Sequence, residues 1–248
     1  MSDPQFVSFL SDYGSADEFA GVCRAVILRA APAARIIDVT HEIPAHDVRA
    51  GALTLARAAQ YLPPGVVLAV VDPGVGTDRR AVAVEVESGF LVGPDNGLLA
   101  PAVAMLGGAT RVVCLTNLDY QLEAAGATFA GRDVFAPAAG YLAAGVALTD
   151  LGDLVDPLSL VPGMMPLPRD EGGRIVAEVL WVDRFGNLQL NVDPEELVVV
   201  VDSYGLVSLA YDRSPAADAL GLRAGSAVTL AGPSPNGAAP PPAGEAVS

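Results

Sequence analysis

Residues 66–80 read VVLAVVDPGVGTDRR and give the clearest indication of the architecture. Val66–Val71 is a continuous run of apolar, mostly β-branched residues, which is typical of a strand that is buried on both faces of a sheet. Pro63-Pro64-Gly65 ends a helix just before this strand, and that helix, Val48–Leu62, has Asp47 as its N-terminal cap. A helix followed directly by a buried strand indicates an α/β sheet with crossover connections.

The same alternation continues on both sides of this stretch. Ser15 and Glu18 fit a capping box at the start of a helix that runs to Ala31 and is ended by Pro32. Strands are expected at Phe6–Leu10, Arg35–Val39, Ala81–Val86 and Arg111–Leu115, and Asp133 is expected to cap a further helix, Val134–Leu148. We therefore predict an N-terminal, mostly parallel α/β sandwich domain over residues 1–157.

The pattern changes after residue 157. Residues 158–172 are rich in Pro and Met and are expected to form a linker. Short strands without intervening helices are expected at Arg174–Val182, Leu188–Val192, Leu197–Val201, Leu206–Ala210 and Ala227–Ala231. They predict a small all-β domain, a C-terminal barrel over residues 173–232. The remaining residues, 233–248, have the composition of a disordered tail.

The charged residues exclude several classes of function. Asp and Glu outnumber the basic residues by 29 to 14, and the net charge of −15 disfavours nucleic-acid binding. Every basic residue is Arg, which excludes Schiff-base chemistry, pyridoxal-phosphate attachment and a phosphate-loop lysine. His41 and His46 are the only histidines, so a three-His zinc site is excluded and no metal is expected. Both are expected to serve loop packing or a subunit contact.

The cysteines and the apolar segments bear on location. Cys23 and Cys114 lie far apart in the sequence, and the N-terminus lacks a signal-peptide pattern, so we expect buried thiols in a cytoplasmic protein. The apolar runs are shorter than the roughly 18 residues of a membrane span. We therefore expect no membrane association.

Carboxylates follow two of the predicted strands. Asp12 is placed to accept hydrogen bonds from a ribose diol and Asp17 to meet an ammonium group, since open α/β sheets bind ligands at the carboxyl ends of their strands. The alternative is that both are helix-cap or Asx-turn residues. Asp72 ends the buried strand, and the glycines that follow allow Arg79 to fold back and pair with it. That pair serves either a ligand site or only the closure of a loop.

Two further motifs have simple structural interpretations. Residues 93–97, GPDNG, are expected to be a turn between two strands. In residues 128–137, TFAGRDVFAP, Gly131 allows a close approach of the backbone to a ligand, whereas the capping role alone would explain Asp133.

Residues 181–187, WVDRFGN, hold groups that suit a nucleobase. Phe185 offers a stacking face, and Asn187 offers a bidentate amide for an adenine edge. The alternative is a tight β-turn with a core Phe.

A series of motifs occurs in order along the chain: SDYGSAD, DVTHEIP, VVDPGVGTDRR, VGPDNGLL, TFAGRDVFAPAA, VDRFGN and DSYG. Together they resemble the S-adenosyl-L-methionine (SAM) hydroxide adenosyltransferase family, the adenosine-forming SAM hydrolases, which are relatives of the SAM-dependent fluorinase and chlorinase. The similarity runs from about Phe6 to Leu230. It implies an N-terminal α/β domain, a C-terminal β-barrel, and a homotrimer that holds SAM between one subunit's N-terminal domain and its neighbour's C-terminal domain. SAM is then the substrate, adenosine and methionine are the products, and no cofactor is expected.

The resemblance also implies roles for individual residues. Asp72 and Arg79 match two members of the Asp-Arg-His set with which the family's hydrolases act on the attacking water. The implied substrate-binding residues are Asp12 for the ribose hydroxyls, Asp17 for the methionine end, Asp183 and Ser203 for the methionine amino acid group, Phe185 and Asn187 for adenine, and Gly131 beside the ligand. His46 stands where the halogenating relatives carry a Trp that packs on the ligand.

One position departs from the family pattern. The hydrolase motif Thr-Phe-His-Gly-Arg-Asp here has Ala130 in the place of His. A methyl group neither accepts a proton nor orients water. The resemblance therefore implies a SAM hydrolase with impaired catalysis: either a substituted variant that traps ligand or a natural member with weakened or altered activity.

Two alternatives to a hydrolase stay open. One is a non-catalytic SAM- or adenosine-binding protein, which the substitution at Ala130 favours. The other is a SAM-dependent halogenase such as a chlorinase, whose chlorinating members share Gly131. The halogenating relatives carry Tyr at the position of Asp72, and a carboxylate would repel a halide by about 4 kcal/mol at about 4 Å and an effective dielectric of about 20. Asp72 thus favours water as the nucleophile.

Overall fold

The computed structural model describes residues 6–126, 128–164, 166–172, 174–192, 204–210 and 215–231. The chain divides into two compact units, residues 1–164 and residues 165–248. The division falls inside the segment 158–172, and the domain bounds given above for residues 1–157 and 173–232 stay a prediction. Within the described residues, the helices are too short or too polar to cross a membrane.

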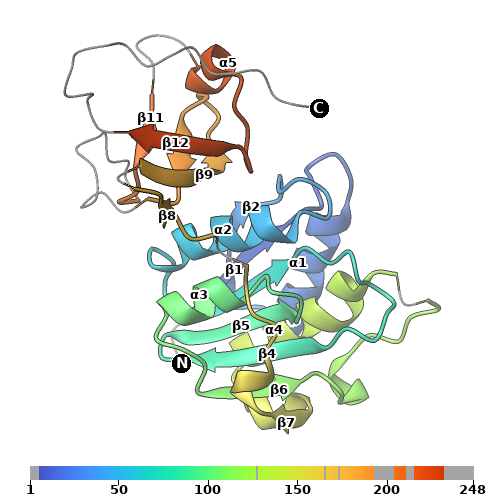
Figure 1. The fold of residues 1–248 in the computed structure, drawn as a ribbon. Helices are drawn as coiled ribbons and strands as arrows, with labels where there is room; N and C mark the ends of the chain where they lie inside the picture. The colour runs from blue at the N-terminus through green and yellow to red at the C-terminus, as the bar shows by residue number, and fades with distance from the viewer. Residues whose placement is uncertain are drawn as a thin grey trace, which may run out of the picture. The chain divides into compact units, whose positions relative to one another are not determined.

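A seven-stranded sheet in the order β2-β1-β3-β5-β4-β6-β7 forms the centre of the first unit (Figure 1). Its strands are β1 (Phe6–Ser11), β2 (Arg35–Thr40), β3 (Gly65–Val70), β4 (Ala81–Val86), β5 (Gly89–Pro94), β6 (Arg111–Cys114) and β7 (Asp153–Val155). β1 runs parallel to β2 and β3, and β3 runs parallel to β5, whereas β4 is antiparallel to β5 and β6, and β6 to β7. The sheet is mixed, so the prediction of a mostly parallel sheet is wrong. Only Glu87 and Ser88 join β4 to β5, and a parallel pair needs a much longer crossover.

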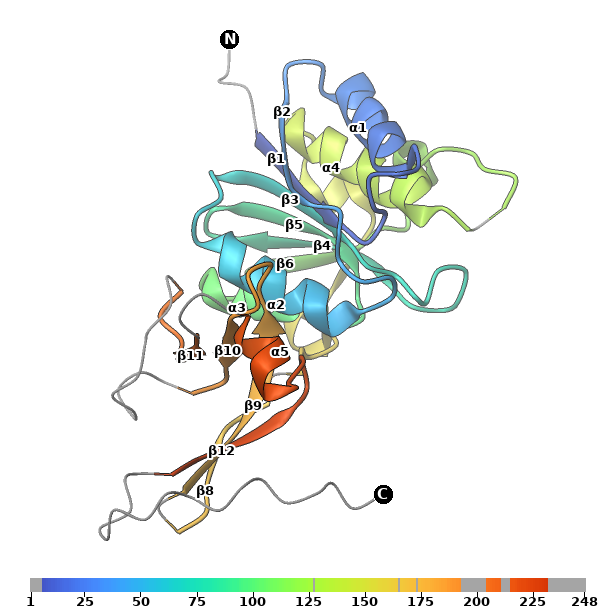
Figure 2. The same ribbon diagram turned by 90° about the horizontal axis from the view of Figure 1, so that it is seen from above.

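The central strand β3 is buried on both faces, as predicted. Its alternate residues enter two separate cores: Val66, Leu68 and Val70 on one face, and Val67 and Ala69 on the other. The helices α1 (Phe19–Ala30) and α4 (Ala136–Ala143) cover the first face, and α2 (Val48–Ala59) and α3 (Ala100–Met105) cover the second (Figure 2). The first unit is therefore a three-layer sandwich, which fixes the carboxyl ends of β1 and β3 side by side.

The starts of the helices follow the sequence in one case and depart from it in another. Asp47 caps α2 as predicted, because its carboxylate accepts a backbone hydrogen bond of 2.8 Å from the first turn. The capping box at Ser15 does not form, and α1 begins only at Phe19. Gly14 has a left-handed backbone, with φ of +67°, and donates its N–H to the carbonyl of His41 at 2.7 Å. The chain after β1 is thus first drawn towards the end of β2, which delays the helix.

A π-helical turn, Gly131–Phe135, precedes α4 and replaces the predicted cap. Asp133 lies inside this turn, where it accepts a hydrogen bond of 2.6 Å from Nε of Arg132, so it does not cap a helix. Accordingly, α4 begins at Ala136 instead of residue 134. It ends at Ala143, before Gly145, whose left-handed φ of +92° turns the chain away.

The second unit contains an antiparallel sheet in the order β11-β10-β9-β12, with β8 paired to β9. Its elements are β8 (Arg169–Asp170), β9 (Arg174–Val182), β10 (Leu188–Leu190), β11 (Ser208–Leu209), α5 (Ala216–Leu220) and β12 (Ala227–Ala231). The described residues form this sheet and not a closed barrel. The helix α5 corrects the all-β prediction: Ala and Leu are strong helix formers, and they follow Pro215 directly. The predicted strand Leu197–Val201 and the tail 233–248 lie outside the described residues.

Candidate active site

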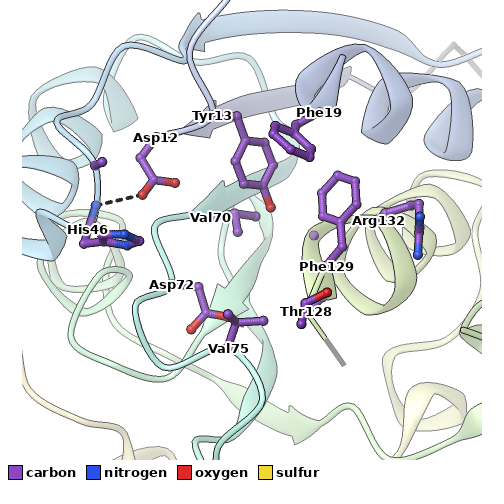
Figure 3. A pocket seen from close by; sticks show the side chains of 13 residues that line it. Asp12, Tyr13, Phe19, His46, Val70, Asp72, Val75, Thr128, Phe129 and Arg132 are labelled. Atoms are coloured by element: carbon purple, nitrogen blue, oxygen red, sulfur yellow. Dashed lines mark hydrogen bonds between the residues drawn. The ribbon is translucent and has the colours of Figure 1, made fainter. Parts of the chain in front are cut away.

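A cavity of about 520 Å³ opens in the first unit at the carboxyl ends of β1 and β3 (Figure 3). Four segments contribute its walls: the chain after β1, the loop before α2, the chain after β3, and the chain before α4. The lining residues are Asp12, Tyr13, Phe19, Ala45, His46, Val70, Asp72, Val75, Thr128, Phe129, Ala130, Gly131 and Arg132. Small-molecule sites commonly have volumes of about 300–1,000 Å³ and lie at this edge of an open α/β sheet.

Asp72 and Arg79 form a bidentate ion pair at this edge, which confirms the predicted pairing. Nε of Arg79 donates to both carboxylate oxygens at 2.9 Å, and Nη2 donates to Oδ2 at 2.5 Å. The Arg79 guanidinium also lies over the ring of Phe135, 5.1 Å from its centroid. The loop can turn back because Gly76 has a φ of +78°. The two side chains are only 7% and 16% exposed, so the carboxylate is held in one orientation beside the cavity.

Asn96 anchors the strand end that carries Asp72, a role that no sequence motif indicates. Its side-chain amide donates to the carbonyl of Val71 at 2.9 Å, and its Oδ1 accepts the N–H of Leu98 at 3.1 Å. Residues 93–97 thus connect β5 to α3, and the expected turn between two strands is wrong. An Asn in this loop is a signal for the Asx turn that Asn96 forms with Leu98, but it carries no signal for the bond to Val71.

Asp12 and His46 both line the cavity and are joined by a hydrogen bond. Oδ2 of Asp12 accepts the backbone N–H of His46 at 2.9 Å, as Figure 3 shows. His46 has a φ of +67°, a conformation that costs a non-glycine residue energy and is over-represented at functional sites. Asp17 is exposed and is not among the residues that line the cavity. The structure therefore brings Asp12 and His46 to the cavity, and leaves Asp17 outside its walls.

A chain of hydrogen bonds through Ser11, His41 and Asp38 links β1 to β2 beside the cavity edge. Ser11 Oγ lies 2.7 Å from Nδ1 of His41, and Nε2 of His41 lies 3.0 Å from Oδ1 of Asp38. The His41 ring packs edge-on against Phe9, with 4.6 Å between the ring centroids. His41 thus serves loop packing, one of its two expected roles, by joining the ends of β1 and β2. Sequence reasoning missed Ser11 and Asp38, because a single Ser or Asp in a strand carries no local signal.

Ala130 and Gly131 lie in the cavity wall next to Tyr13. A Cβ atom added to Gly131 would lie 1.9 Å from the Tyr13 hydroxyl, so only glycine fits at this position. Burial raises the pKa of the Tyr13 hydroxyl above its ordinary value, and the nearby Cys23 and Asp12 add to this effect. The packing of Tyr13 thus explains why residue 131 is glycine, independently of any contact with a ligand.

The sequence profile of the SAM hydroxide adenosyltransferase N-terminal domain matches residues 7–152, more than half of the chain. The chain belongs to the SAM hydroxide adenosyltransferase family. This confirms the resemblance that the ordered motifs indicated.

Three relatives of this family member span nearly the whole chain. The (R)-S-adenosyl-L-methionine hydrolase of Salinispora tropica is 47% identical, over 91% of this chain and 97% of the relative. The fluorinase of an Actinoplanes species is 24% identical, over 90% of this chain and 96% of the relative. A solved structure of a conserved protein from Thermotoga maritima has a TM-score of 0.83 at 30% identity, over 91% of this chain and 99% of the other.

Three residues that the family resemblance implicates lie in the second unit, in the turn between β9 and β10. Oδ1 of Asp183 accepts the backbone N–H groups of Phe185 and Asn187, both at 2.8 Å, and its Oδ2 accepts the Asn187 side-chain amide at 2.7 Å. The tight turn is thus present, but Phe185 is 77% exposed, so the interpretation as a core Phe is wrong. Ser203 lies outside the described residues.

Proposed function

We propose that this chain is a SAM hydrolase that cleaves SAM to adenosine and L-methionine by attack of water at C5′. The observation that carries the proposal is the bidentate Asp72–Arg79 pair beside a cavity of about 520 Å³. Its second support is the 47% identity to a protein named (R)-S-adenosyl-L-methionine hydrolase. A protein that only binds SAM would not need a pair of residues that activates water.

The reaction is an in-line displacement at the ribose C5′ of SAM. The water oxygen forms a bond to C5′ while the C5′–S bond breaks, and the electron pair of that bond goes to sulfur. Methionine leaves as a neutral thioether and needs no proton. Asp72 accepts a hydrogen bond from the water and takes its proton, and Arg79 keeps the carboxylate oriented. Positioning of this kind contributes to the rate by holding the reactants in a near-attack geometry.

The same proposal assigns the binding groups. Asp12 holds the ribose hydroxyls: its Oδ2 is fixed by the N–H of His46, and among the described residues no group hydrogen-bonds its Oδ1. The other assignments rest on the family resemblance alone: Asp17 for the methionine end, Asp183 and Ser203 for the amino acid group, Phe185 and Asn187 for adenine, and Gly131 beside the ligand.

Ala130 makes the proposed hydrolysis slow. The experiment is to incubate the protein with SAM and to follow adenosine by chromatography, for the wild type and for Ala130→His. We expect slow adenosine release from the wild type and a rate that is about ten- to a thousandfold higher for Ala130→His. Asp72→Ala should lower kcat more than it weakens SAM binding. A protein that binds SAM and releases no adenosine would refute the hydrolase.

A non-catalytic SAM or adenosine sensor is the second candidate function, and Ala130 is the observation that favours it. A halogenase is tested in the same assay, by adding chloride and looking for 5′-chloro-5′-deoxyadenosine. The Asp72 carboxylate argues against that product, because it would repel a halide at the position of the nucleophile.

We also propose a cytoplasmic homotrimer, on the basis of the family resemblance and the unpaired cysteines Cys23 and Cys114. Light scattering after gel filtration tests the oligomeric state, with an expected mass of three times the chain's 25.3 kDa. A monomeric mass would contradict this part of the proposal.

A further inference from the structure

The Tyr13 hydroxyl occupies a fixed place in the cavity. Three aromatic rings surround the Tyr13 ring: Phe9, Phe19 and Phe129, with centroid distances of 6.4, 5.9 and 5.7 Å. The contacts with Phe9 and Phe129 are edge-on, at interplanar angles of 79° and 81°. Packing from several sides leaves the ring little rotational freedom, so the position of the hydroxyl is set by the apolar core and not by a hydrogen bond.

That position lies against the wall segment that carries Ala130 and Gly131. The Tyr13 hydroxyl is 1.9 Å from where a Cβ atom of Gly131 would stand, and Gly131 follows Ala130 in the wall. Figure 3 shows the hydroxyl pointing into the space that the labelled residues surround. Across the part of the chain that the structure describes, no protein group hydrogen-bonds this hydroxyl. A polar group in such a place takes its hydrogen bonds from water or from a ligand.

The hydroxyl keeps its proton at neutral pH. Burial is the main cause of the raised pKa of Tyr13, and the nearby Cys23, Asp12 and Asp72 also raise the pKa, against a lowering by Arg79. A protonated hydroxyl both donates and accepts hydrogen bonds, but it does not act as a base. Its contribution to a reaction is therefore orientation, and a proton must leave through another group.

We propose that Tyr13 is a further catalytic residue, whose hydroxyl accepts a hydrogen bond from the attacking water. Tyr13 and Asp72 together orient that water. The inference rests on the proposed SAM hydrolysis. One O–H of the water donates to Asp72 and the other donates to Tyr13, so that a lone pair of the water oxygen faces C5′. As the C–O bond forms and the C5′–S bond breaks, the first proton passes to the Asp72 carboxylate. The second stays on oxygen as the 5′-hydroxyl of adenosine.

Tyr13→Phe tests this role, because it removes only the hydroxyl and keeps the ring in its aromatic surroundings. We expect kcat to fall by about three- to tenfold, the worth of one hydrogen bond, with KM for SAM unchanged within about twofold. Tyr141→Phe is the matched control: its ring packs edge-on against Tyr120 at 4.9 Å, and it is not among the residues that line the cavity. The control should keep the wild-type kcat.

A double mutant that combines Tyr13→Phe with Ala130→His distinguishes a role of Tyr13 in orienting water from a purely structural role. In an Ala130→His background the imidazole supplies a second partner for the water, so Tyr13→Phe should then cost less than about twofold in kcat. An unchanged kcat for Tyr13→Phe in the wild-type background, or a rise in KM alone, would overturn the proposal.

A crystal structure with SAM decides the matter without turnover. We expect a water within about 3.2 Å of both the Tyr13 hydroxyl and the Asp72 carboxylate, in line with C5′. If the wild type binds SAM and releases no adenosine, the hydrolase proposal fails, and this water still supports or refutes the role of Tyr13. SAM bound with another group on the Tyr13 hydroxyl would exclude that role.

Discussion

Replacing Arg79 by Met removes the charge opposite Asp72 and keeps an unbranched side chain over the ring of Phe135. The carboxylate that remains is 7% exposed and loses three hydrogen bonds, of 2.9, 2.9 and 2.5 Å. Breaking a buried ion pair from one side costs about 3–5 kcal/mol. The lower end, about 3 kcal/mol, is expected because Asp72 borders an open cavity of about 520 Å³, which has room for water to solvate the unpaired carboxylate. For a chain of this length, that cost lowers the Tm by about 6–12 °C.

Thermal unfolding of three proteins measures this effect: the wild type, Arg79→Met and Arg169→Met. Arg169 is the matched control, because it pairs with Glu171 at 3.5 Å while both side chains are mostly exposed, at 70% and 59%. Such a surface pair is worth less than about 1 kcal/mol. A second replacement, Asp72→Asn in the Arg79→Met protein, should restore part of the lost Tm, since it removes the unpaired charge. If Arg79→Met lowers the Tm no more than Arg169→Met does, the buried pair lacks the energy that its geometry implies.

Three further outcomes are expected. Gly131→Ala places a methyl group 1.9 Å from the Tyr13 hydroxyl and should destabilise the fold by about 1–3 kcal/mol in urea unfolding. Adding Tyr13→Phe should restore part of this stability, and a neutral effect of Gly131→Ala would contradict the close approach. Burial raises the pKa of the Cys23 thiol to about 12, so a short pulse of iodoacetamide at neutral pH should leave this residue unlabelled in peptide mass spectrometry. Labelling at the rate of a free thiol would show that Cys23 is open to solvent. Hydrogen bonding to Arg111 lowers the pKa of Glu85, so the contribution of the Glu85 carboxylate to folding stability is complete above about pH 4.5 and is lost as the pH falls through the lower folded-state pKa. Glu85→Gln should therefore be less stable than the wild type at neutral pH, with a difference in unfolding free energy that shrinks in acid. A difference independent of pH would count against the Glu85–Arg111 pair.

The elements that the sequence predicted well are those whose signal is local. Val66–Val71 is apolar without interruption because neighbouring residues enter different cores, and this pattern is visible without any knowledge of the partners. The cap of α2 by Asp47 likewise depends on one turn of helix. The strand β5 was missed because it begins at Gly89, which suggests a break. The structural reason for that glycine is tertiary: a Cβ atom there would lie 1.9 Å from the carbonyl oxygen of Gly65 on the neighbouring strand.

The candidate site divides in the same way. The spacing of Asp72 and Arg79 within one short loop was enough to predict their ion pair, because the intervening glycines permit the tight turn that brings opposite charges together. The groups that support the site come from segments that are distant in sequence. Asn96 reaches the carbonyl of Val71 from another strand end, and the Tyr13 hydroxyl packs against Gly131 in the cavity wall. Such contacts exist only once the sheet has brought the strand ends together.

The charge balance of the cavity bears on how a cationic substrate can react there. Both carboxylates in its walls are already engaged within the first unit: Asp12 with the N–H of His46, and Asp72 with Arg79. Much of the remaining wall is apolar or aromatic, through Val70, Val75, Phe19 and Phe129. A sulfonium loses its charge on the way to the transition state, so an uncompensated carboxylate beside sulfur would stabilise the bound substrate more than the transition state and slow the reaction. Arg79 neutralises the charge of Asp72, so this carboxylate can accept a hydrogen bond from water while it adds little attraction for the sulfonium. The partner of Asp12 is a neutral N–H, so Asp12 keeps its charge and is suited to holding the ribose and not to facing the sulfur. The bidentate Asp72–Arg79 pair thus has two consequences for the proposed hydrolysis: it orients the base, and it removes an electrostatic penalty that an isolated aspartate would impose.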